Sequence, residues 1–434
     1  MAEMDNRMKL LTEMFSRNRV EKTIGKCVDK GINKKQLREL KTAEKLKELM
    51  VRIATETLEF EPGHQAAIPK DDGTDRIVYV GETTERFVCS LINESLFALC
   101  PQLVHKSCKS YQEGLGCGSS VQEFAHKWGK MYGKFYVVKT DYHHYFDDII
   151  REKVFGMIDK IEDALGCKRG TEPVMNLLRK MFSNDLLFDL DNNLIEKWSG
   201  IRQGNAVGSF FADAILYDID EYMSNKYPYY VRYSDDCITL SEDPAEVKDD
   251  LIRLIKPYGV TLNPKKVEVH YDDFVKFLGF NVNGYNITLS ESRIDKFQKD
   301  LFDRVRKCVN GKQATKAVVN YLYKGNGKYS FGTSVLGVIN VESDIQEMNN
   351  YVMDLIRLTM IKKRKTDYLK KWQVGGIGVE TWHKDYTLVR VPTHYCEKAA
   401  KLTPKEIDGY YTLACMRKNL LASRNVYDTI VRSL

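Results

Sequence analysis

The sequence has 434 residues, of which 43% are apolar and 29% are charged. This length and composition allow a sizeable core and predict more than one domain, and they exclude a disordered, collagen-like or wholly coiled-coil chain. The 66 Lys and Arg residues and the 60 Asp and Glu residues leave a net charge of +6. This mildly basic balance is compatible with a polyanionic partner but does not require one.

The 10 cysteines form no Cys-x-x-Cys pair, so we interpret them as reduced thiols and not as zinc ligands. The N-terminal MAEMDNRMKLL carries charges where a secretory signal has its apolar run. No segment reaches the roughly 18 consecutive apolar residues of a membrane span. We therefore expect a cytoplasmic protein with no membrane partner.

The first part of the chain predicts helices and then a sheet. Residues 8–59 repeat apolar side chains at helical spacing among many Lys, Glu and Arg residues, which predicts a helical segment. Residues 66–80 place two β-rich runs on either side of Asp-Asp-Gly, which is typical of a hairpin. Residues 134–141 predict a strand that ends at a carboxylate, Asp141.

The middle of the chain continues this alternation. The pattern predicts a helix over 172–182, a glycine-punctuated loop over 200–208 and an apolar helix over 209–223. Residues 229–240 contain two strand-like runs joined at Ser-Asp-Asp. This predicts a tight hairpin with two carboxylates exposed at its tip.

The last part predicts a change from strands to helices. Residues 243–259 form an amphipathic helical pattern that ends at glycine, further strands follow, and the pattern is mostly helical from Ser290 onward. Residues 362–371 contain a cluster of six Lys and Arg side chains. This cluster is either a solvated helical face or a surface for nucleic acid, and the sequence does not separate the two.

Three carboxylates carry the chemistry that this pattern predicts. Asp141 follows a strand, and Asp235 and Asp236 lie at a hairpin tip. Two Mg²⁺ ions about 4 Å apart, held by such oxygens, activate a 3′-hydroxyl and stabilise a leaving pyrophosphate in phosphoryl transfer. A single Asp is more often a helix cap or a turn residue, so this interpretation depends on all three.

Five segments occur in the order and spacing of known polymerase motifs: KTDYHHYFDDI, GIRQGNAVGSFFADAILYDID, YSDD, LNPKK and FLGF. The sequence therefore resembles a bacterial reverse transcriptase of the group II intron, retron and phage-defence assemblage. The resemblance covers Ile68 to Phe280.

The resemblance implies an α+β fold of the right-hand polymerase type, with an antiparallel-sheet palm, mixed fingers, a helical thumb, and helical N- and C-terminal extensions. The domains that follow from it are an N-terminal helical segment (1–62), fingers (63–134 and 151–199), a palm with the catalytic acids (135–150 and 200–284), a helical thumb (285–375) and a C-terminal extension (376–434).

The resemblance also implies roles at matching positions. Asp141, Asp235 and Asp236 would be catalytic and would hold two Mg²⁺ ions with the backbone carbonyl of Tyr142, and Mn²⁺ can substitute. Phe146 stands five residues after the first acid, where the family has an aromatic that excludes a 2′-hydroxyl. Its alternative is a place in the core under the palm.

Further positions match the family's dNTP-binding elements. Lys70 and Arg76 correspond to two cations on the incoming triphosphate, and both are otherwise ordinary cations beside a turn. Gln203 and Gly204 resemble the element that lies against the nascent base pair. Lys266 resembles the lysine near the pyrophosphate, with a plain surface turn as the equal alternative.

Three more residues match the family's primer grip, and three positions differ from the family's motifs. Phe277, Leu278 and Gly279 resemble the hairpin that holds the primer terminus. Glu85-Arg86 falls where the family has an aspartate-arginine pair, which implies template or fingers support. Arg202 stands where proline is common. Gly208-Ser209 replaces the Ser-Pro of group II introns and retrons and the Ser-Gln of diversity-generating elements, which argues against those three classes.

What remains is most like the defence-associated, abortive-infection type. It implies an enzyme that copies a structured non-coding RNA template into a DNA product from dNTPs during anti-phage defence. Neither an HNH-type endonuclease pattern nor a Val-Thr-Gly thumb signature occurs. The alternatives are a diversity-generating reverse transcriptase, template-independent protein-primed DNA synthesis, and a non-enzymatic RNA scaffold, which the three acids disfavour. The sequence leaves the oligomeric state open.

Overall fold

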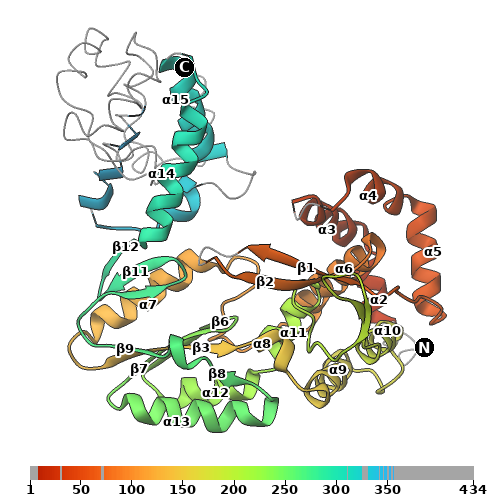
Figure 1. Cartoon of the computed structure of the whole chain (residues 1–434). Helices are drawn as coiled ribbons and strands as arrows, with labels where there is room; N and C mark the ends of the chain where they lie inside the picture. Colours follow the sequence, from red (N-terminus) through yellow and green to blue (C-terminus); the bar gives the residue numbers. More distant parts are fainter. Residues whose placement is uncertain are drawn as a thin grey trace. The chain divides into compact units, whose positions relative to one another are not determined.

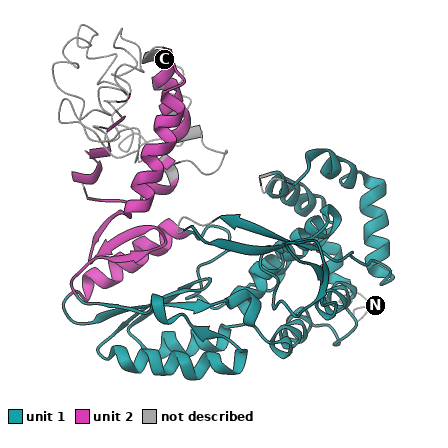
Figure 2. Cartoon of the chain, viewed as in Figure 1, with its two compact units in different colours: residues 1–116, 133–271 teal, residues 117–132, 272–434 magenta. Residues whose placement is uncertain are grey.

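The structure is a computed structural model and falls into two compact units, residues 1–116 with 133–271, and residues 117–132 with 272–434 (Figure 2). The residues that it describes are 8–29, 32–69, 73–309, 311–324, 331–341, 343–345, 347–348, 351–352 and 355. The basic cluster at 362–371 and the predicted C-terminal extension at 376–434 lie outside them. The predicted division into fingers, palm and thumb stays a prediction.

Within the described residues, the first unit begins with four helices, as the periodicity of residues 8–59 predicted (Figure 1): α2 (Lys9–Met14), α3 (Arg17–Asp29), α4 (Lys34–Leu40) and α5 (Ala43–Ala54). Side-chain caps set two of their starts. The Asn33 side chain accepts from the backbone of Lys35 and Gln36, and the Thr42 hydroxyl accepts from the Lys45 amide. Helices α2 and α3 pack against the long helix α6 (Thr83–Leu99).

The predicted hairpin at 66–80 is confirmed. Strands β1 (His64–Pro69) and β2 (Asp75–Val80) are antiparallel neighbours, and β4 (Leu186–Phe188) and β5 (Leu194–Glu196) complete a sheet in the order β2-β1-β4-β5. The turn residues 70–72, and with them Lys70, lie outside the described residues.

A second sheet of the first unit has β3 (Tyr136–His143) in its middle. The hairpin of β6 (Tyr229–Tyr233) and β7 (Asp236–Ser241) lies on one side of β3, and β8 (Thr261–Leu262) and β9 (Glu268–His270) pair with its other side. The prediction that this strand ends at Asp141 is wrong. Pairing of Tyr142 and His143 with β8 extends the strand by these two residues.

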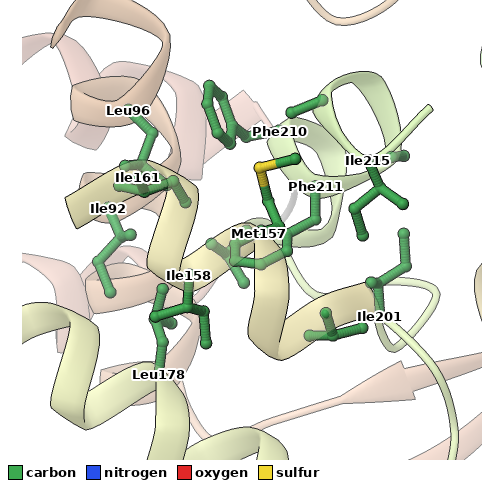
Figure 3. Packing of buried hydrophobic residues seen from close by; sticks show 14 of the residues in the cluster. Ile92, Leu96, Met157, Ile158, Ile161, Leu178, Ile201, Phe210, Phe211 and Ile215 are labelled. Carbon is green, nitrogen blue, oxygen red and sulfur yellow. The ribbon is translucent and has the colours of Figure 1, made fainter. Parts of the chain in front are cut away.

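Helices α9 (Arg151–Leu165), α10 (Pro173–Ser183) and α11 (Gly208–Ala214) enclose the core of this unit with α6. Figure 3 shows side chains of these helices pointing toward one another, among them Leu96, Ile158, Leu178 and Phe211. Burial of each such side chain stabilises the fold by roughly 1.5–3 kcal/mol. The apolar side chains that recur at helical spacing in the sequence thus pack into one continuous core.

The predicted helix at 209–223 is instead two helices, α11 and α12 (Tyr217–Lys226). The carbonyl oxygens of Ala212 and Asp213 accept hydrogen bonds from Arg232, and that of Ala212 also accepts from the Tyr145 hydroxyl. These are carbonyls that a continuous helix would use for the amides four residues on. The break therefore follows from side-chain donors that arrive from other parts of the chain.

The remaining elements of the first unit follow the sequence pattern. Helix α13 (Pro244–Ile255) begins at the Asp243 side chain, which accepts from two backbone amides, and a short turn (Lys256–Tyr258) then ends at left-handed Gly259. Shorter helical pieces are Pro101–Leu103, α8 (Tyr145–Asp148) and Pro264–Lys266.

The second unit joins one helix to a small sheet. Helix α7 (Cys117–Lys130) packs against the antiparallel strands β10 (Val275–Phe277), β11 (Phe280–Asn283) and β12 (Asn286–Leu289), with the rings of Phe124 and Phe277 5.9 Å apart. Helices α14 (Glu291–Val305) and α15 (Gly311–Val319) and the helical turns Asn320–Lys324 and Gly332–Leu336 follow.

Both units combine helices with largely antiparallel sheets, which confirms the predicted α+β class. Among the described residues, none of the helices has the length and apolar character needed to cross a membrane.

Candidate active site

The three predicted catalytic acids lie on adjacent strands. Asp141 on β3 pairs across the sheet with Asp236, the first residue of β7. Asp235 lies in the turn just before, and its carbonyl oxygen accepts from the Tyr142 amide at 3.1 Å. The turn is tight, with Ser234 left-handed at φ 59°. The β6–β7 hairpin therefore brings all three acids to one place on the sheet.

These carboxylates are not on an exposed tip, which corrects the sequence-based expectation. Asp141 is only 3% exposed, and Asp235 and Asp236 are half-buried. Burial and the charge of Asp141 raise the pKa of Asp235. Burial, together with the charges of Asp235 and Asp141, raises the pKa of Asp236 to about 7. Because each carboxylate opposes the ionisation of its neighbours, positive charge at this point stabilises the ionised acids.

One cation already lies at this point. Lys266 Nζ is 2.7 Å from Oδ2 of Asp141, although the Lys266 side chain is otherwise half exposed. Partial burial disfavours the charged ammonium, but the hydrogen bond and charge of Asp141 and the charges of Asp235 and Asp236 outweigh it and raise the pKa of Lys266. Asn263 positions this lysine. Its side-chain oxygen accepts from the Lys265 backbone amide and caps the Pro264–Lys266 turn, and its own backbone amide donates to the Asp141 carbonyl oxygen at 2.8 Å.

The donor set has the chemistry of a magnesium site, since carboxylate oxygens are the ligands that Mg²⁺ takes in proteins. In the part of the chain that the structure describes, no group of three or more His, Cys, Asp and Glu side chains is arranged to hold a metal ion. Asp141 is engaged by Lys266 instead. The acids therefore fit a cation by their chemistry and mutual repulsion, and binding requires Asp141 to exchange its lysine partner.

A cleft of about 820 Å³ opens beside these acids. The predicted site residues that line it are Asp141, Tyr142, Asp235, Lys266, Arg76, Phe146 and Gln203. Asp236 and Gly204 are not part of its lining, although each adjoins a residue that is. The structure thus gathers most of the predicted catalytic and dNTP-binding residues of the first unit around one space.

Phe146 lies on α8, directly after β3. Its ring is half-buried, packs on the core and also lines the cleft. Its carbonyl oxygen accepts from the Ile201 amide at 2.8 Å, which joins α8 to the loop that carries Gln203. This position is compatible both with a gate against the 2′-hydroxyl and with a core role, so the assignment stays a prediction.

A buried network under the hairpin was not predicted from the sequence. Arg232 on β6 is fully buried and contacts both oxygens of Asp220, at 2.8 and 2.6 Å. It also donates to the Ser234 carbonyl oxygen at 3.2 Å. The Ser234 amide donates to Ser110 Oγ at 2.9 Å, and that hydroxyl donates to the buried carboxylate of Asp213. This network fixes the turn that carries Asp235.

A signal for this network was present in the sequence. Arg232 interrupts a strand of apolar and aromatic residues, and Asp213 and Asp220 interrupt an apolar helix. Buried charges of opposite sign on two apolar elements are stable only when they are paired. Their partners could not be identified without the fold.

The predicted primer-grip residues belong to the second unit. Leu278 and Gly279 form the turn between β10 and β11, with φ values of 49° and 80°. A side chain at Gly279 would collide with Arg293, whose guanidinium lies 4.4 Å above the Phe280 ring. The left-handed backbone therefore favours glycine here, and its role toward a primer stays a prediction.

Comparison with known proteins identifies the domain. Residues 68–282 match the family model for reverse transcriptase (RNA-dependent DNA polymerase). No curated protein matches the sequence.

Solved structures that resemble the chain include telomerases. They include apo telomerase from Candida tropicalis (15% identity, 72% of this chain and 58% of that chain, TM-score 0.43), the same enzyme truncated from its C-terminal domain (14%, 53% and 55%, TM-score 0.39), and telomerase from Candida albicans in complex with a fragment of telomeric RNA (12%, 88% and 65%, TM-score 0.43). The chain spans only 55% to 65% of these telomerase chains.

The bacterial subclass stays a prediction, whereas the predicted enzyme class is confirmed by the family match. Residues 68–282 match the reverse transcriptase domain, which is a nucleotidyltransferase domain.

Proposed function

We propose that the chain is an RNA-directed DNA polymerase that copies a small, structured non-coding RNA into DNA by two-metal phosphoryl transfer, in defence against phage. The observation that carries this proposal is the cleft that Asp141, Asp235 and Lys266 share with Arg76 and Gln203. It joins an acidic centre to basic and amide groups of the kind that hold a nucleotide triphosphate.

The acids are proposed to hold the metal. Asp141, Asp235 and Asp236 would bind Mg²⁺ with the backbone carbonyl of Tyr142. Bound Mg²⁺ supplies activation of the primer 3′-hydroxyl and stabilises charge on the leaving pyrophosphate, and Mn²⁺ can take its place. Lys266 would then release Asp141, and its ammonium would donate to the pyrophosphate side of the reaction.

The other lining residues are proposed to select the nucleotide. The exposed guanidinium of Arg76 on β2 would bind the triphosphate, with Lys70 as the second cation of the family pattern. Phe146 would exclude a 2′-hydroxyl, and Gln203 and Gly204 would lie against the nascent base pair. Phe277, Leu278 and Gly279 would hold the primer terminus.

The template and the biological role rest on the resemblance of the sequence to defence-associated reverse transcriptases. Arg202 and Gly208-Ser209 support this choice, because they depart from the motifs of group II introns, retrons and diversity-generating elements. A structured RNA supplied by the cell is the proposed partner, and the cytoplasm is the proposed compartment.

Primer extension tests the activity. The full chain is given an oligo(dT) primer on poly(rA), dTTP and Mg²⁺, beside the Asp235→Asn/Asp236→Asn variant and an exposed-acid control, Asp191→Asn. We expect extension by the wild type and the control and none by the double variant. Extension that is equal without poly(rA), or DNA that stays covalently attached to the protein, would replace templated copying by protein-primed synthesis. No extension with Mg²⁺ or Mn²⁺ would refute the proposal.

A further inference from the structure

The loop that carries Gln203 is attached to strand β2. The Tyr79 amide donates to the Gln203 carbonyl oxygen at 2.6 Å. Gly204 follows with φ 105°, and a side chain there would lie 2.5 Å from the Tyr79 carbonyl oxygen. The backbone of the loop therefore lies directly against the strand, and only glycine allows this approach.

Four side chains join these two segments to each other and to helix α6, and we name them the Tyr79 cluster: Tyr79, Glu85, Arg202 and Asn205. The Tyr79 hydroxyl donates to Glu85 Oε2 at 3.0 Å, and Asn205 Nδ2 donates to Glu85 Oε1 at 2.9 Å. The Arg202 guanidinium lies 5.0 Å above the Tyr79 ring, with Nη1 3.5 Å from its hydroxyl. Tyr79 thus links β2 to both α6 and the loop, and the Asn205–Glu85 bond joins the loop to α6 directly.

The residues of the Tyr79 cluster are largely buried, so the loss of one contact would leave a polar group without a partner and away from water. Glu85 is fully buried, and Tyr79 and Arg202 are 7% exposed each. Burial raises the pKa of Glu85 to about 7, although Arg202 and the hydroxyl of Tyr79 lower it. Buried polar groups of this kind fix a unique arrangement when all are paired, and they are costly when one partner is removed. Gly81 leaves the necessary space, since a side chain there would overlap the Glu85 carboxylate.

Arg202 is held in an unfavourable backbone conformation. Its φ is 55°, a left-handed value that costs a residue other than glycine about 1 kcal/mol or more. Its Nη2 donates to the carbonyl oxygen of Met181 at 2.7 Å and to that of Asn184, at the end of α10. The side chain therefore compensates for the strain by capping a helix end and covering Tyr79.

The cluster lies next to the proposed nucleotide-binding face. Strand β2 carries Arg76, the loop carries Gln203, and both residues line the cleft together with Tyr79 and Arg202. We infer that Arg202 and Glu85 are positioning residues that act through Tyr79 to hold β2 against the 200–205 loop. The position of β2 against this loop sets the affinity for the incoming nucleotide and not the rate of nucleotide transfer. This consequence rests on the proposed function.

Hydrogen exchange of the full chain tests the positioning without any activity. Arg202→Gly removes the side chain and accepts the left-handed backbone, and Asn192→Gly, at another left-handed position with φ 64°, is its matched control. Glu85→Gln is compared with the exposed Glu44→Gln. We expect residues 75–80 and 200–205 to exchange roughly tenfold faster in both cluster variants, with residues 229–241 and both controls unchanged. Equal acceleration everywhere, or no acceleration in folded variants, would overturn the inference.

Single-nucleotide incorporation tests the consequence. We expect Arg202→Gly and Glu85→Gln to raise the KM for dNTP about tenfold while kcat stays within about twofold, and Arg202→Lys to recover part of the loss. A merely structural role would lower the active fraction without raising KM. A fall in kcat alone would therefore contradict the inference. If the wild type incorporates no nucleotide, the proposed function fails, and the exchange data still decide whether the cluster holds the two segments together.

Discussion

Lys266 Nζ lies 2.7 Å from Oδ2 of Asp141, so the first of the proposed catalytic acids has a lysine as its partner where a metal-dependent reaction needs a metal ligand. The Lys266 ammonium and a bound Mg²⁺ would both occupy the position beside Oδ2 of Asp141. Lysine and Mg²⁺ are therefore expected to compete for Asp141. This relationship separates two effects of the lysine, one on metal affinity and one on the chemical step.

Lys266→Gln should lower the Mg²⁺ concentration that gives half-maximal extension by a few-fold, because the competing ammonium is gone. The same change should lower kcat at saturating Mg²⁺ by about 10²-fold if the ammonium assists the leaving pyrophosphate. Lys265→Gln is the matched control, since Lys265 is exposed in the same turn and should change neither quantity. Unchanged Mg²⁺ dependence in Lys266→Gln would exclude the competition.

Removing the two hairpin acids should abolish synthesis and stabilise the fold at high pH. The pKa of Asp236 is about 7 in the folded chain and 3.8 in its ordinary state. The folded state therefore holds this proton more tightly, and its stability falls as pH rises from about 4 to 7. Urea unfolding without Mg²⁺ should show Asp235→Asn/Asp236→Asn stabilised by about 2 kcal/mol more at pH 8 than at pH 5.

The exposed-acid control Asp191→Asn should show no such dependence on pH. Mg²⁺ added at pH 8 should stabilise the wild type and leave the double variant unchanged, since a ligand stabilises only the state that binds it. A double variant that is destabilised equally at both pH values would mean that the acids have a structural role in the hairpin.

Breaking the buried pair beneath the hairpin should be costly. Asp220→Asn or Arg232→Met leaves one buried charge without its partner, which destabilises by roughly 3–5 kcal/mol. The double variant should be destabilised by at least about 1 kcal/mol less than the sum of the single changes, because the two side chains contact each other. Additive effects in urea unfolding would show that the hydrogen bonds of Arg232 to backbone carbonyls, and not the ion pair, dominate its contribution.

Phe146→Ala should weaken discrimination against ribonucleotides. The half-buried ring lines the cleft beside Asp141, and its removal opens space for a 2′-hydroxyl. The ratio of kcat/KM for dTTP to that for UTP should fall at least about tenfold in single-nucleotide incorporation. Phe155→Ala, which removes a half-buried ring elsewhere in the first unit, controls for loss of packing. An unchanged ratio in Phe146→Ala would assign this ring to the core alone.

Local patterns in the sequence were sufficient for much of this architecture. The hairpins at 66–80 and 229–240 follow from alternation around turn residues, and the N-terminal helices follow from apolar spacing and capping side chains. The hairpins and helices depend on neighbours close in sequence. The grouping of Asp141 with Asp235 and Asp236 joins distant segments, and it could be expected only because the motifs that carry these acids resemble those of a known family.

Features that depend on distant partners could not be predicted. The break between α11 and α12 results from donors on Arg232 and Tyr145, and the extension of β3 results from pairing with β8. The sequence shows Arg202 only as an arginine where the family often has proline. Its contact with Tyr79 joins residues 123 positions apart and could not be predicted. Long-range contacts of this kind require the folded chain.

Sequencing of the nucleic acid that copurifies with the chain from expressing cells tests the central claim most directly. Wild type and Asp235→Asn/Asp236→Asn are compared, with RNase and protease treatments in parallel. The account predicts one discrete cDNA complementary to a bound RNA in the wild type and no cDNA in the double variant. Random-sequence DNA attached to protein, or bound RNA without DNA in either sample, would contradict it.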